Sequence, residues 1–210
     1  MATYLFDDML KTIKIIYQDD SILVVNKPAG ISVVPQLENI LNKELKVNSN
    51  VNYYPCHRLD QETSGLVIFA RGRLVQEKVM LQFKDHKVFK LYIAFVQGKL
   101  NKSNFKINFP IEHKPSETNV SLLEERKNFS VVEINPLTGR TNQIRIHFKL
   151  IGHPLVGERR FAFAKDFNLK FRRTALHACF LEFVHPLTGE KLSLKADLPD
   201  DMNKFLLTHN

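Results

Sequence analysis

Hydrophobic and polar positions near the start of the chain predict two short strands joined by a turn. Apolar residues recur at every second position over 13–17, Asp19-Asp20-Ser21 interrupts the run, and 22–25 is apolar on both faces. Lys27-Pro28-Ala29-Gly30 then predicts a stop, because proline disfavours helix in the residue before it and glycine permits a tight turn. We therefore expect a strand, a turn and a buried strand that ends at this stop.

The rest of the chain shows a few helical patterns among many short strands. Val75, Val79 and Phe83 lie four apart and predict a helix over 73–86, and shorter helices are expected over 37–47 and 142–151. Thr141 is a candidate cap for the last helix, and Gly152 is its candidate end. Since hairpins can join most of the strands, the pattern predicts an α+β fold with a largely antiparallel sheet. The remaining strands are expected at 66–70, 88–96, 104–112, 119–123, 130–135, 175–184 and 191–196.

Length and composition are those of one globular domain, with or without two lobes. The chain has 210 residues, of which 44% are hydrophobic and 16 are Phe, which is enough for a core and excludes wholesale disorder. Apolar runs such as 22–25 and 66–70 are far shorter than the roughly 18 residues of a membrane-spanning helix. We expect a short lead-in over 1–12 and a single domain over 13–210.

Two features indicate a reduced, cytoplasmic protein. The N-terminal residues carry Asp7 and Asp8 and lack a basic stretch, so they do not form a secretory signal. The two cysteines, Cys56 and Cys179, make no disulfide framework.

The net charge raises nucleic acid as a partner. The chain has 30 Lys and Arg against 22 Asp and Glu, a formal charge of +8. A basic surface of this kind is complementary to the phosphate backbone of RNA or DNA. An ordinary solvated basic surface explains the charge equally well, so charge alone does not decide between the two.

A polar segment ahead of a buried strand contains the first candidate for chemistry. In His57-Arg58-Leu59-Asp60-Gln61-Glu62-Thr63-Ser64-Gly65-Leu66, a carboxylate lies on a loop that a strand would hold in place. Asp60 is a candidate nucleophile or base, and Arg58 is a candidate phosphate-binding residue. The simpler alternative is a turn that Asp60 caps through Thr63 and Ser64, and spacing alone favours it.

Arg145 lies near the start of the helix expected over 142–151, within Gly139-Arg140-Thr141-Asn142-Gln143-Ile144-Arg145-Ile146-His147. A positive charge at that place is unfavourable to the helix dipole, so a specific partner is indicated, either a carboxylate or a phosphate. The alternative is an exposed surface arginine, which is the commoner case.

The segment 158–173 interleaves basic and aromatic residues. Such a segment either clamps a nucleic acid backbone and stacks on bases, or is a solvated loop that phenylalanines anchor to the core, and the spacing does not separate these alternatives. Its basic and aromatic residues are Arg159, Arg160, Lys165, Lys170, Arg172 and Arg173, with Phe161, Phe163, Phe167 and Phe171.

Metal sites and nucleotide cofactors find no support in the sequence. Cys56-His57 and His177-Ala178-Cys179 lack the paired spacing of zinc sites, and His177 and Cys179 are better explained as core residues of a strand. Glycine motifs that bind phosphate are missing, and Ser64 lacks the GxSxG setting of a hydrolase nucleophile. The residues alone therefore give little support to a metal site or a nucleotide cofactor.

In combination, these segments resemble the RluA-type family of RNA pseudouridine synthases, from about Ile15 to Met202. Each motif alone is weak, but their number and order make the resemblance specific. The opening motif is similar to Asn26-Lys27-Pro28-Ala29-Gly30, the catalytic motif to 57–66, the tyrosine strand to Lys90-Leu91-Tyr92-Ile93-Ala94, the arginine motif to 139–147 with 152–157, and the closing strands to Ala175-Leu176-His177-Ala178 and 185–190.

The resemblance implies a fold and a reaction, and the reaction is expected to need neither a metal nor an organic cofactor. The fold is that of the pseudouridine synthases, with a cleft across the sheet. In the reaction, the N1–C1′ bond of a uridine in structured tRNA or rRNA breaks, the uracil turns while held, and a C5–C1′ bond forms. Asp60 corresponds to the catalytic aspartate, which either attacks C1′ or removes the 2′ proton. Tyr92 corresponds to the tyrosine that stacks on the uracil, and Arg145 to the arginine that pairs with the aspartate.

The same resemblance implies RNA contacts. Arg58 corresponds to an arginine that helps displace the target nucleotide, which must leave folded RNA to reach a pocket. Since there is no room before Ile13 for the S4 RNA-binding domain of many members, we expect the catalytic domain itself to recognise RNA, as a monomer without an obligatory protein partner. The expected RNA-binding residues are His57, Arg58, Arg140, Arg159, Arg160, Arg172 and Arg173.

Some positions depart from the family pattern, and two other functions stay open. Asn142 stands where the family usually has His, Val34 where His is common, and Glu158 where Asp usually follows the glycine. The first alternative function is a non-catalytic RNA-binding or RNA-folding module on the same scaffold. The joint presence of Asp60, Tyr92 and Arg145 argues against it, because binding alone would not require all three. The second is a hydrolytic nucleosidase that frees uracil.

Overall fold

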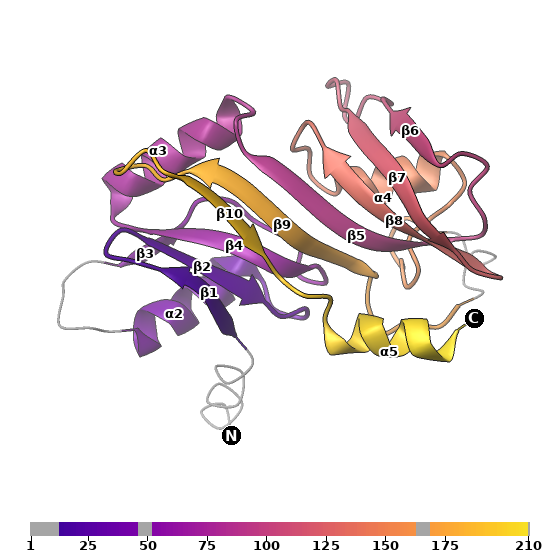
Figure 1. Cartoon of the computed structure of the whole chain (residues 1–210), viewed down its shortest axis with the longest axis horizontal. Helices are drawn as coiled ribbons and strands as arrows, with labels where there is room; N and C mark the ends of the chain where they lie inside the picture. The colour runs from indigo at the N-terminus through magenta and orange to yellow at the C-terminus, as the bar shows by residue number, and fades with distance from the viewer. Residues whose placement is uncertain (1–12, 46–51, 163–168, 210) are drawn as a thin grey trace. The chain divides into compact units, whose positions relative to one another are not determined.

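Residues 13–45, 52–162 and 169–209 are described by the computed structural model of the protein, and the predicted lead-in over 1–12 lies outside them. Where the sequence predicts one domain with or without two lobes, the chain divides into two compact units (Figure 1). The first unit runs up to Phe89 and takes in Phe180–Ala196, and the second comprises Lys90–Cys179 and the chain from Asp197 onward. Most of the second unit is therefore an insertion into the sequence of the first.

The strands of the first unit lie close to their predicted positions. β1 (Lys14–Gln18) and β2 (Ile22–Lys27) pair antiparallel across the predicted turn, and β2 pairs antiparallel with β4 (Ser64–Arg71). β3 (Tyr53–Pro55), which the sequence pattern does not predict, pairs antiparallel with β4. Near the end of the chain, β10 (Lys191–Lys195) forms an antiparallel hairpin with the last residues of β9 (Leu176–Val184).

The helices of the first unit also follow the predicted pattern. α3 (Arg73–Lys84) falls within 73–86, and its Val79 is fully buried in a core cluster with β2 and β4. Val75 and Phe83, on the same face of α3, pack against that cluster, which confirms the four-residue spacing. α2 (Glu38–Glu44) falls within 37–47 and follows a single wide turn, η1 (Val33–Leu37).

The second unit is built on four antiparallel strands, the first residues of β9 and two helices. The strands are hydrogen-bonded in the order β5-β8-β7-β6. Ten strands in the described part of the chain, with mostly antiparallel pairing, confirm the predicted α+β fold. The elements of this unit are β5 (Phe89–Gln97), β6 (Asn104–Ile107), β7 (Thr118–Glu125), β8 (Phe129–Pro136), α4 (Gln143–Leu150) and α5 (Asp200–Thr208).

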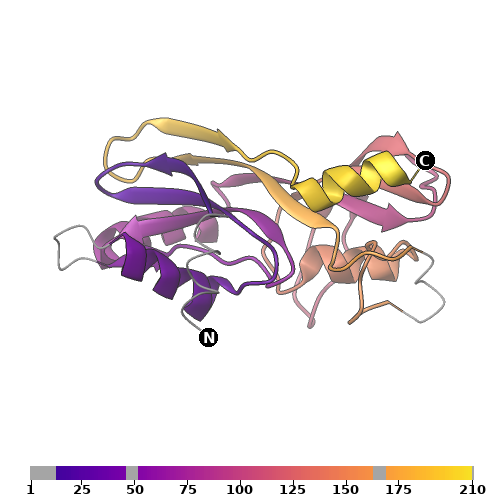
Figure 2. The ribbon, with the colours of Figure 1, turned by 90° about the horizontal axis from the view of Figure 1, so that it is seen from below.

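The two helices of the second unit cover opposite faces of its strands (Figure 2). Successive residues of a strand point to opposite faces. Ala94 of β5 accordingly clusters with Phe148 of α4, whereas the neighbouring Phe95 clusters with Phe205 of α5. The helix α4 belongs to the predicted set, and α5 does not.

Backbone hydrogen bonds stop α4 where the sequence predicts its end. Gly152 has a φ of 81°, in the left-handed region that glycine adopts without strain. Its N–H donates to the carbonyl of Lys149 at 3.1 Å, and the N–H of His153 donates to the carbonyl of Phe148 at 2.9 Å. This pair of bonds is a Schellman motif, which satisfies carbonyl groups that the end of the helix would leave unpaired.

Candidate active site

Asp60 lies in the first unit, on the loop between β3 and β4. The N–H of Thr63 donates to the backbone carbonyl of Asp60 at 3.0 Å, which closes a tight turn directly before the buried strand. Earlier in the loop, Nε2 of His57 accepts the N–H of Ile68 at 3.1 Å, and the imidazole ring lies 4.6 Å from the ring of Phe83. The loop is therefore fastened to both β4 and α3. His57, an expected RNA-binding residue, has an anchoring role in this structure.

A buried lysine supports the same loop, and sequence reasoning assigned it no role. Lys27 is 0% exposed, and its Nζ donates to the carbonyls of Pro28 and Ile31 at 2.9 Å each and of Gln61 at 3.2 Å. The N–H of Gly30 also donates to the Gln61 carbonyl, at 2.8 Å. Because a buried ammonium is unfavourable without hydrogen bonds, these carbonyls keep the opening motif next to the residue that follows the candidate aspartate.

Tyr92 lies in the second unit, in the middle of β5, where it pairs in register with Ile134 of β8. Its side chain is half-buried and packs against the core cluster that includes Ala94 of β5 and Ile144 and Phe148 of α4. The phenol therefore lies on the face of β5 that α4 covers. This helix is also the one that carries Arg145.

Arg145 is 8% exposed, so the alternative of an exposed surface arginine is wrong. Its Nε donates to Oε2 of Glu158 at 2.6 Å, and its Nη2 donates to Oε1 of the same carboxylate at 2.8 Å. Its Nη1 donates to Oδ1 of Asn142 at 3.0 Å. The sequence predicts a carboxylate or phosphate partner for this arginine, and the structure supplies a carboxylate. Glu158 was noted only as a departure from the family pattern.

Hydrogen bonds keep the Glu158 carboxylate ionised. Burial by itself raises the pKa of Glu158, but the hydrogen bonds from Arg145 and from the backbone N–H groups of Arg160 and Phe161 outweigh it, so the pKa lies below its usual value. The two N–H groups donate to Oε1 at 2.8 and 3.2 Å. A charged, fully bonded carboxylate thus lies against the guanidinium.

The start of α4 differs from the prediction. Thr141 does not cap the helix, and Asn142 precedes it in the left-handed conformation with a φ of 55°. The side chain of Gln143 fixes this turn, because its Oε1 accepts the N–H of Arg140 at 3.0 Å and the hydroxyl of Thr138 at 2.7 Å. The left-handed turn places the Asn142 side chain within reach of the guanidinium one helical turn later. The family's usual His at this position would present a ring there instead.

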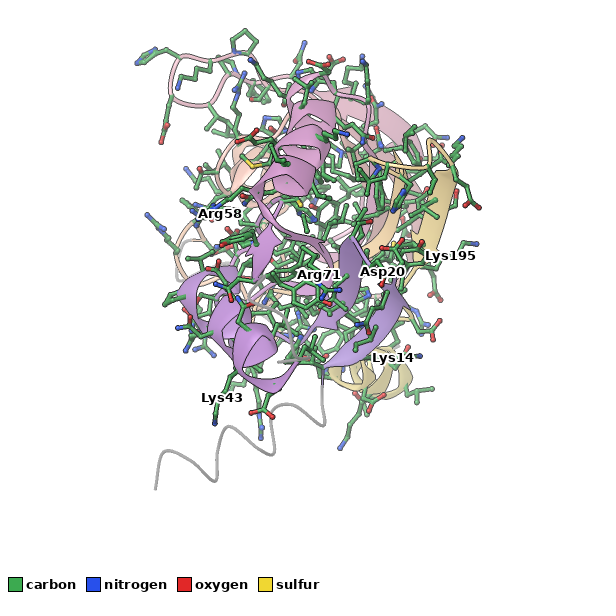
Figure 3. All side chains as sticks on the ribbon, turned by 90° about the vertical axis from the view of Figure 1, so that its left-hand side faces the viewer. Lys14, Asp20, Lys43, Arg58, Arg71 and Lys195 are labelled. Carbon is green, nitrogen blue, oxygen red and sulfur yellow. The ribbon has the colours of Figure 1, made fainter. Side chains whose placement is uncertain are left out.

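Most of the expected RNA-binding arginines are exposed. Arg58, which precedes the candidate aspartate on the same loop, lies in the first unit and extends into solvent (Figure 3). In the second unit, Arg140 is exposed and donates through Nε to the carbonyl of Pro115 at 3.2 Å. The other exposed members are Arg159, Arg160 and Arg172, and residues 163–168 of the segment lie outside the described part of the chain.

Arg173 differs from the other arginines of its segment. It is 7% exposed, and its Nε and Nη2 donate to the carboxylate of Asp201, at the start of α5, at 2.6 and 2.9 Å. Its Nη1 donates to the carbonyls of Thr174 and Leu176 at 3.0 and 3.2 Å. This placement argues against an RNA contact by Arg173, and we leave it out of the proposed RNA-binding set. Phe171 packs in the core beside Phe205, so this part of the segment is anchored.

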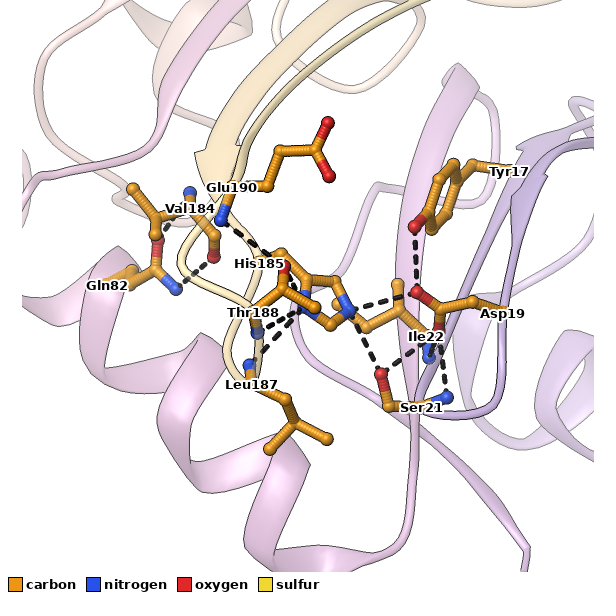
Figure 4. A network of polar contacts seen from close by, with 10 residues as sticks. All are labelled: Tyr17, Asp19, Ser21, Ile22, Gln82, Val184, His185, Leu187, Thr188 and Glu190. Carbon is orange, nitrogen blue, oxygen red and sulfur yellow. Dashed lines mark hydrogen bonds and ion pairs between the residues drawn. The ribbon is translucent and has the colours of Figure 1, made fainter.

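A polar network elsewhere in the first unit combines Ser, His and Asp (Figure 4). Nε2 of the buried His185 lies 3.0 Å from both Oγ of Ser21 and Oδ2 of Asp19. Nδ1 of the same ring accepts the N–H of Thr188 at 3.0 Å. Because an amide only donates, Nδ1 is the acceptor and Nε2 carries the proton in the neutral ring.

This network is not a nucleophile site. In a Ser-His-Asp triad the carboxylate and the hydroxyl bind opposite nitrogens of the imidazole, whereas Asp19 and Ser21 share one nitrogen here. The network instead joins the turn between β1 and β2 to the turn between β9 and β10. Sequence reasoning did not find it, because its members are 164 residues apart.

Metal binding, membrane spanning and thiol chemistry find no support in the described ranges. In residues 13–45, 52–162 and 169–209, no group of three His, Cys, Asp or Glu side chains is arranged to bind a metal ion. No helix in these ranges is long and apolar enough to span a membrane. Burial raises the pKa of the Cys56 thiol to about 12, so this cysteine is an inert core residue.

A sequence model of the RNA pseudouridylate synthase family matches residues 21–150. The chain belongs to this family. Among relatives, a protein of Zymomonas mobilis named ribosomal large subunit pseudouridine synthase D is 31% identical, over 94% of this chain and 74% of that protein. A protein of the same name from Buchnera aphidicola is 33% identical, over 91% of this chain and 71% of that protein.

The fold of this RNA pseudouridine synthase agrees with that of a solved human structure. Human RNA pseudouridylate synthase domain containing 4 superposes with a TM-score of 0.81 over 97% of this chain and 95% of that chain, at 22% identity. The predicted family, fold and isomerase activity are thereby confirmed, and a non-catalytic module and a hydrolytic nucleosidase are not what the comparisons support. The structure places Asp60 in the first unit and Tyr92 and Arg145 in the second, and their meeting in one cleft stays a prediction.

Proposed function

We propose that this synthase isomerises one or more uridines of large-subunit ribosomal RNA, with Asp60 as its catalytic carboxylate. The observation that carries the proposal is the buried Arg145, whose guanidinium is held in one orientation on the helix that covers the Tyr92 face of β5. A surface arginine would need no such support. Two relatives are named ribosomal large subunit pseudouridine synthases, and this favours ribosomal RNA over transfer RNA as the target class.

The proposed mechanism uses three side chains. Asp60 either attacks C1′ or removes the 2′ proton, and the N1–C1′ bond breaks in both routes. The uracil stays on the Tyr92 ring while it turns, since an aromatic face holds a planar base without fixing its orientation. A bond then forms between C5 and C1′, C5 loses its hydrogen as a proton, and N1 becomes the ring N–H of pseudouridine. Arg145 pairs with the Asp60 carboxylate throughout.

The proposed RNA-binding residues are exposed arginines in each of the two units. They neutralise phosphates and hold the RNA while the target nucleotide is displaced. We further propose that the protein acts in the cytoplasm, as a monomer and without an obligatory protein partner. The proposed set is Arg58, Arg140, Arg159, Arg160 and Arg172.

The experiment compares Asp60→Asn with wild type on total RNA that carries C5-tritiated uridine, prepared from cells that lack the protein. Wild type should release tritium, and Asp60→Asn should release none while its RNA affinity stays within about threefold. Asp20→Asn, which removes a carboxylate from an exposed turn of the same unit, is the matched control and should match wild type.

The same assay separates the alternatives. Turnover by Asp60→Asn near the wild-type rate would contradict the assignment of the carboxylate. Free uracil in place of isomerised nucleoside would point to hydrolysis. Mapping of pseudouridine across the RNA with and without the protein identifies the target, and a new position in tRNA alone would overturn the proposed ribosomal substrate.

A further inference from the structure

We infer that Glu158 is a positioning residue for the reaction: it fixes the Arg145 guanidinium and ties it to the segment that binds RNA. The inference rests on the proposed pairing of Arg145 with Asp60. Nothing in the sequence pattern assigns Glu158 a role, and the carboxylate lies 13 residues beyond the arginine.

The geometry of its hydrogen bonds fixes the Arg145 guanidinium. A guanidinium offers two edges on which a carboxylate binds through two parallel hydrogen bonds. Glu158 occupies the edge formed by Nε and Nη2, with both bonds shorter than 3 Å. Asn142 accepts from Nη1 at 3.0 Å. Because Glu158 occupies one edge and Asn142 binds Nη1, the guanidinium cannot rotate. Its other edge, formed by Nη1 and Nη2, therefore faces one direction, in which a second carboxylate can bind.

Glu158 is itself held rigidly. Its side chain is 0% exposed. The same Oε1 that accepts from Arg145 also accepts the backbone N–H groups of Arg160 and Phe161. A carboxylate with four donors and no solvent exposure has one arrangement, so it transmits its position to the arginine.

Glu158 also links Arg145 to the segment that is proposed to bind RNA. The ring of Phe161 contacts two guanidinium groups, with its centroid 5.0 Å from Cζ of Arg145 and 5.3 Å from Cζ of Arg160. Arg145 is buried and Arg160 is exposed. The Glu158 carboxylate that orients the buried Arg145 therefore also binds the backbone of the exposed Arg160. RNA bound by this segment is thereby held in a fixed position relative to the Arg145 guanidinium.

The experiment measures three quantities for Glu158→Gln: the single-turnover rate of tritium release from C5-tritiated total RNA, the RNA affinity and the melting temperature. The amide keeps the shape but loses the charge and one acceptor. We expect the rate to fall about 100-fold, the order of loss from a small misplacement of a catalytic group, while RNA affinity stays within about threefold. Glu182→Gln, which removes another ion-paired carboxylate, is the control and should react at the wild-type rate.

Rescue by the conservative variant separates positioning from folding. Glu158→Asp keeps the charge and shortens the reach by one methylene, so its rate should lie between those of wild type and Glu158→Gln, at least threefold below wild type. If Glu158→Gln does not fold, Glu158→Asp decides alone. Wild-type rates in either folded variant, or a loss of RNA affinity that accounts for the whole loss of rate, would overturn the inference.

A parallel variant tests the proposed function on which the inference rests. Arg145→Lys keeps a positive charge but offers only one nitrogen, so its rate should fall at least as far as that of Glu158→Gln. A folded Arg145→Lys enzyme with the wild-type rate would overturn the role of the arginine and the inference with it. A slow Arg145→Lys beside a fast Glu158→Gln would overturn the inference alone.

Discussion

The ammonium of Lys27 donates to the backbone carbonyl of Gln61, the residue that follows Asp60, at 3.2 Å. Two further carbonyls, those of Pro28 and Ile31, accept from the same nitrogen. The opening motif of the chain thus contacts, through one buried charge, the loop that carries the proposed catalytic aspartate. A lysine in that place acts on the backbone of the loop, and its effect on the reaction is indirect.

Lys27→Met should destabilise the first unit and slow the reaction. The change leaves buried carbonyls without a donor, so the free energy of unfolding should fall by about 2–4 kcal/mol. Urea unfolding at pH 7 gives this value, and tritium release at a temperature where the variant is folded gives the rate. Lys195→Met, at an exposed position of β10, is the control and should change the free energy by no more than about 0.5 kcal/mol. An equally stable Lys27→Met protein would refute the supporting role.

Asp19 should make the protein sensitive to acid. Burial alone raises the pKa of Asp19, but bonds from the N–H groups of Ser21 and Ile22 and from the hydroxyl of Tyr17 lower it from 3.8 to about 2. A carboxyl whose folded pKa lies below its unfolded pKa stabilises the fold above pH 4, and this contribution is lost as the pH falls from about 4 to about 2. Urea unfolding across this window should show a flatter pH dependence for Asp19→Asn than for wild type, and Asp20→Asn, in the same turn, should keep the wild-type profile. Equal slopes for all three proteins would contradict the prediction.

His147 should add a second pH dependence at higher pH. The ring is fully buried in α4, where its nitrogens lie 2.9 Å from the hydroxyl of Thr118 and 3.0 Å from that of Ser116. Burial lowers the pKa of His147, and the carbonyl of Phe109 opposes this only in part. Because the unfolded chain then binds a proton more readily than the fold, stability should decline as the pH falls below about 6.5.

The measurement for His147 is the free energy of unfolding between pH 8 and pH 5. His147→Gln should be less stable at pH 8 and should lose less stability on acidification. His113→Gln, at an exposed turn, provides the comparison and should follow wild type. A wild-type pH profile in His147→Gln would show that this imidazole does not carry the effect.

Adjacent arginines should behave differently toward RNA. Arg172 is exposed, so Arg172→Ala should weaken RNA binding and reduce the salt dependence of log K by about one unit of slope. Arg173 is paired with Asp201, so Arg173→Met should leave the slope unchanged and lower the free energy of unfolding by about 1–3 kcal/mol. Filter binding at several salt concentrations and urea unfolding test the pair. A reduced slope in a stable Arg173→Met protein would reverse our assignment.

Local periodicity was sufficient for most of the fold. The alternation over 13–17 and the four-residue spacing in 73–86 have one strong interpretation each, and the structure contains β1 and α3 there. β3 has three residues, too few for any period to emerge. The helix α5 did carry a signal, with Asp200 and Asp201 in its first turn and apolar Met202 and Phe205 three apart, but the pattern spans little more than two turns.

The sequence predicted what kind of group Arg145 binds, but not which residue supplies it. The helix dipole indicates that Arg145 needs an anion, which is a local argument. That the anion is Glu158 depends on the path of the chain after α4, which no spacing rule specifies. The Thr141 cap was wrong because the left-handed Asn142 precedes the helix instead, in a turn that the Gln143 side chain fixes by accepting the N–H of Arg140. Arg173 was grouped with the RNA-binding arginines because its burial depends on a helix more than 25 residues later.

The chain leaves the first unit after Phe89 and returns to it at Phe180, and the rings of these two residues meet edge to face with centroids 6.0 Å apart. The inserted segment Lys90–Cys179 thus begins and ends at one pair of contacting residues. Truncation after Phe89 would strip the N-terminal core of Leu181, Phe183 and Leu192, which arrive only after the return. To isolate the first unit, Lys90–Cys179 and the chain from Asp197 onward must both be removed and Phe89 joined to Phe180, since no single cut yields a complete unit.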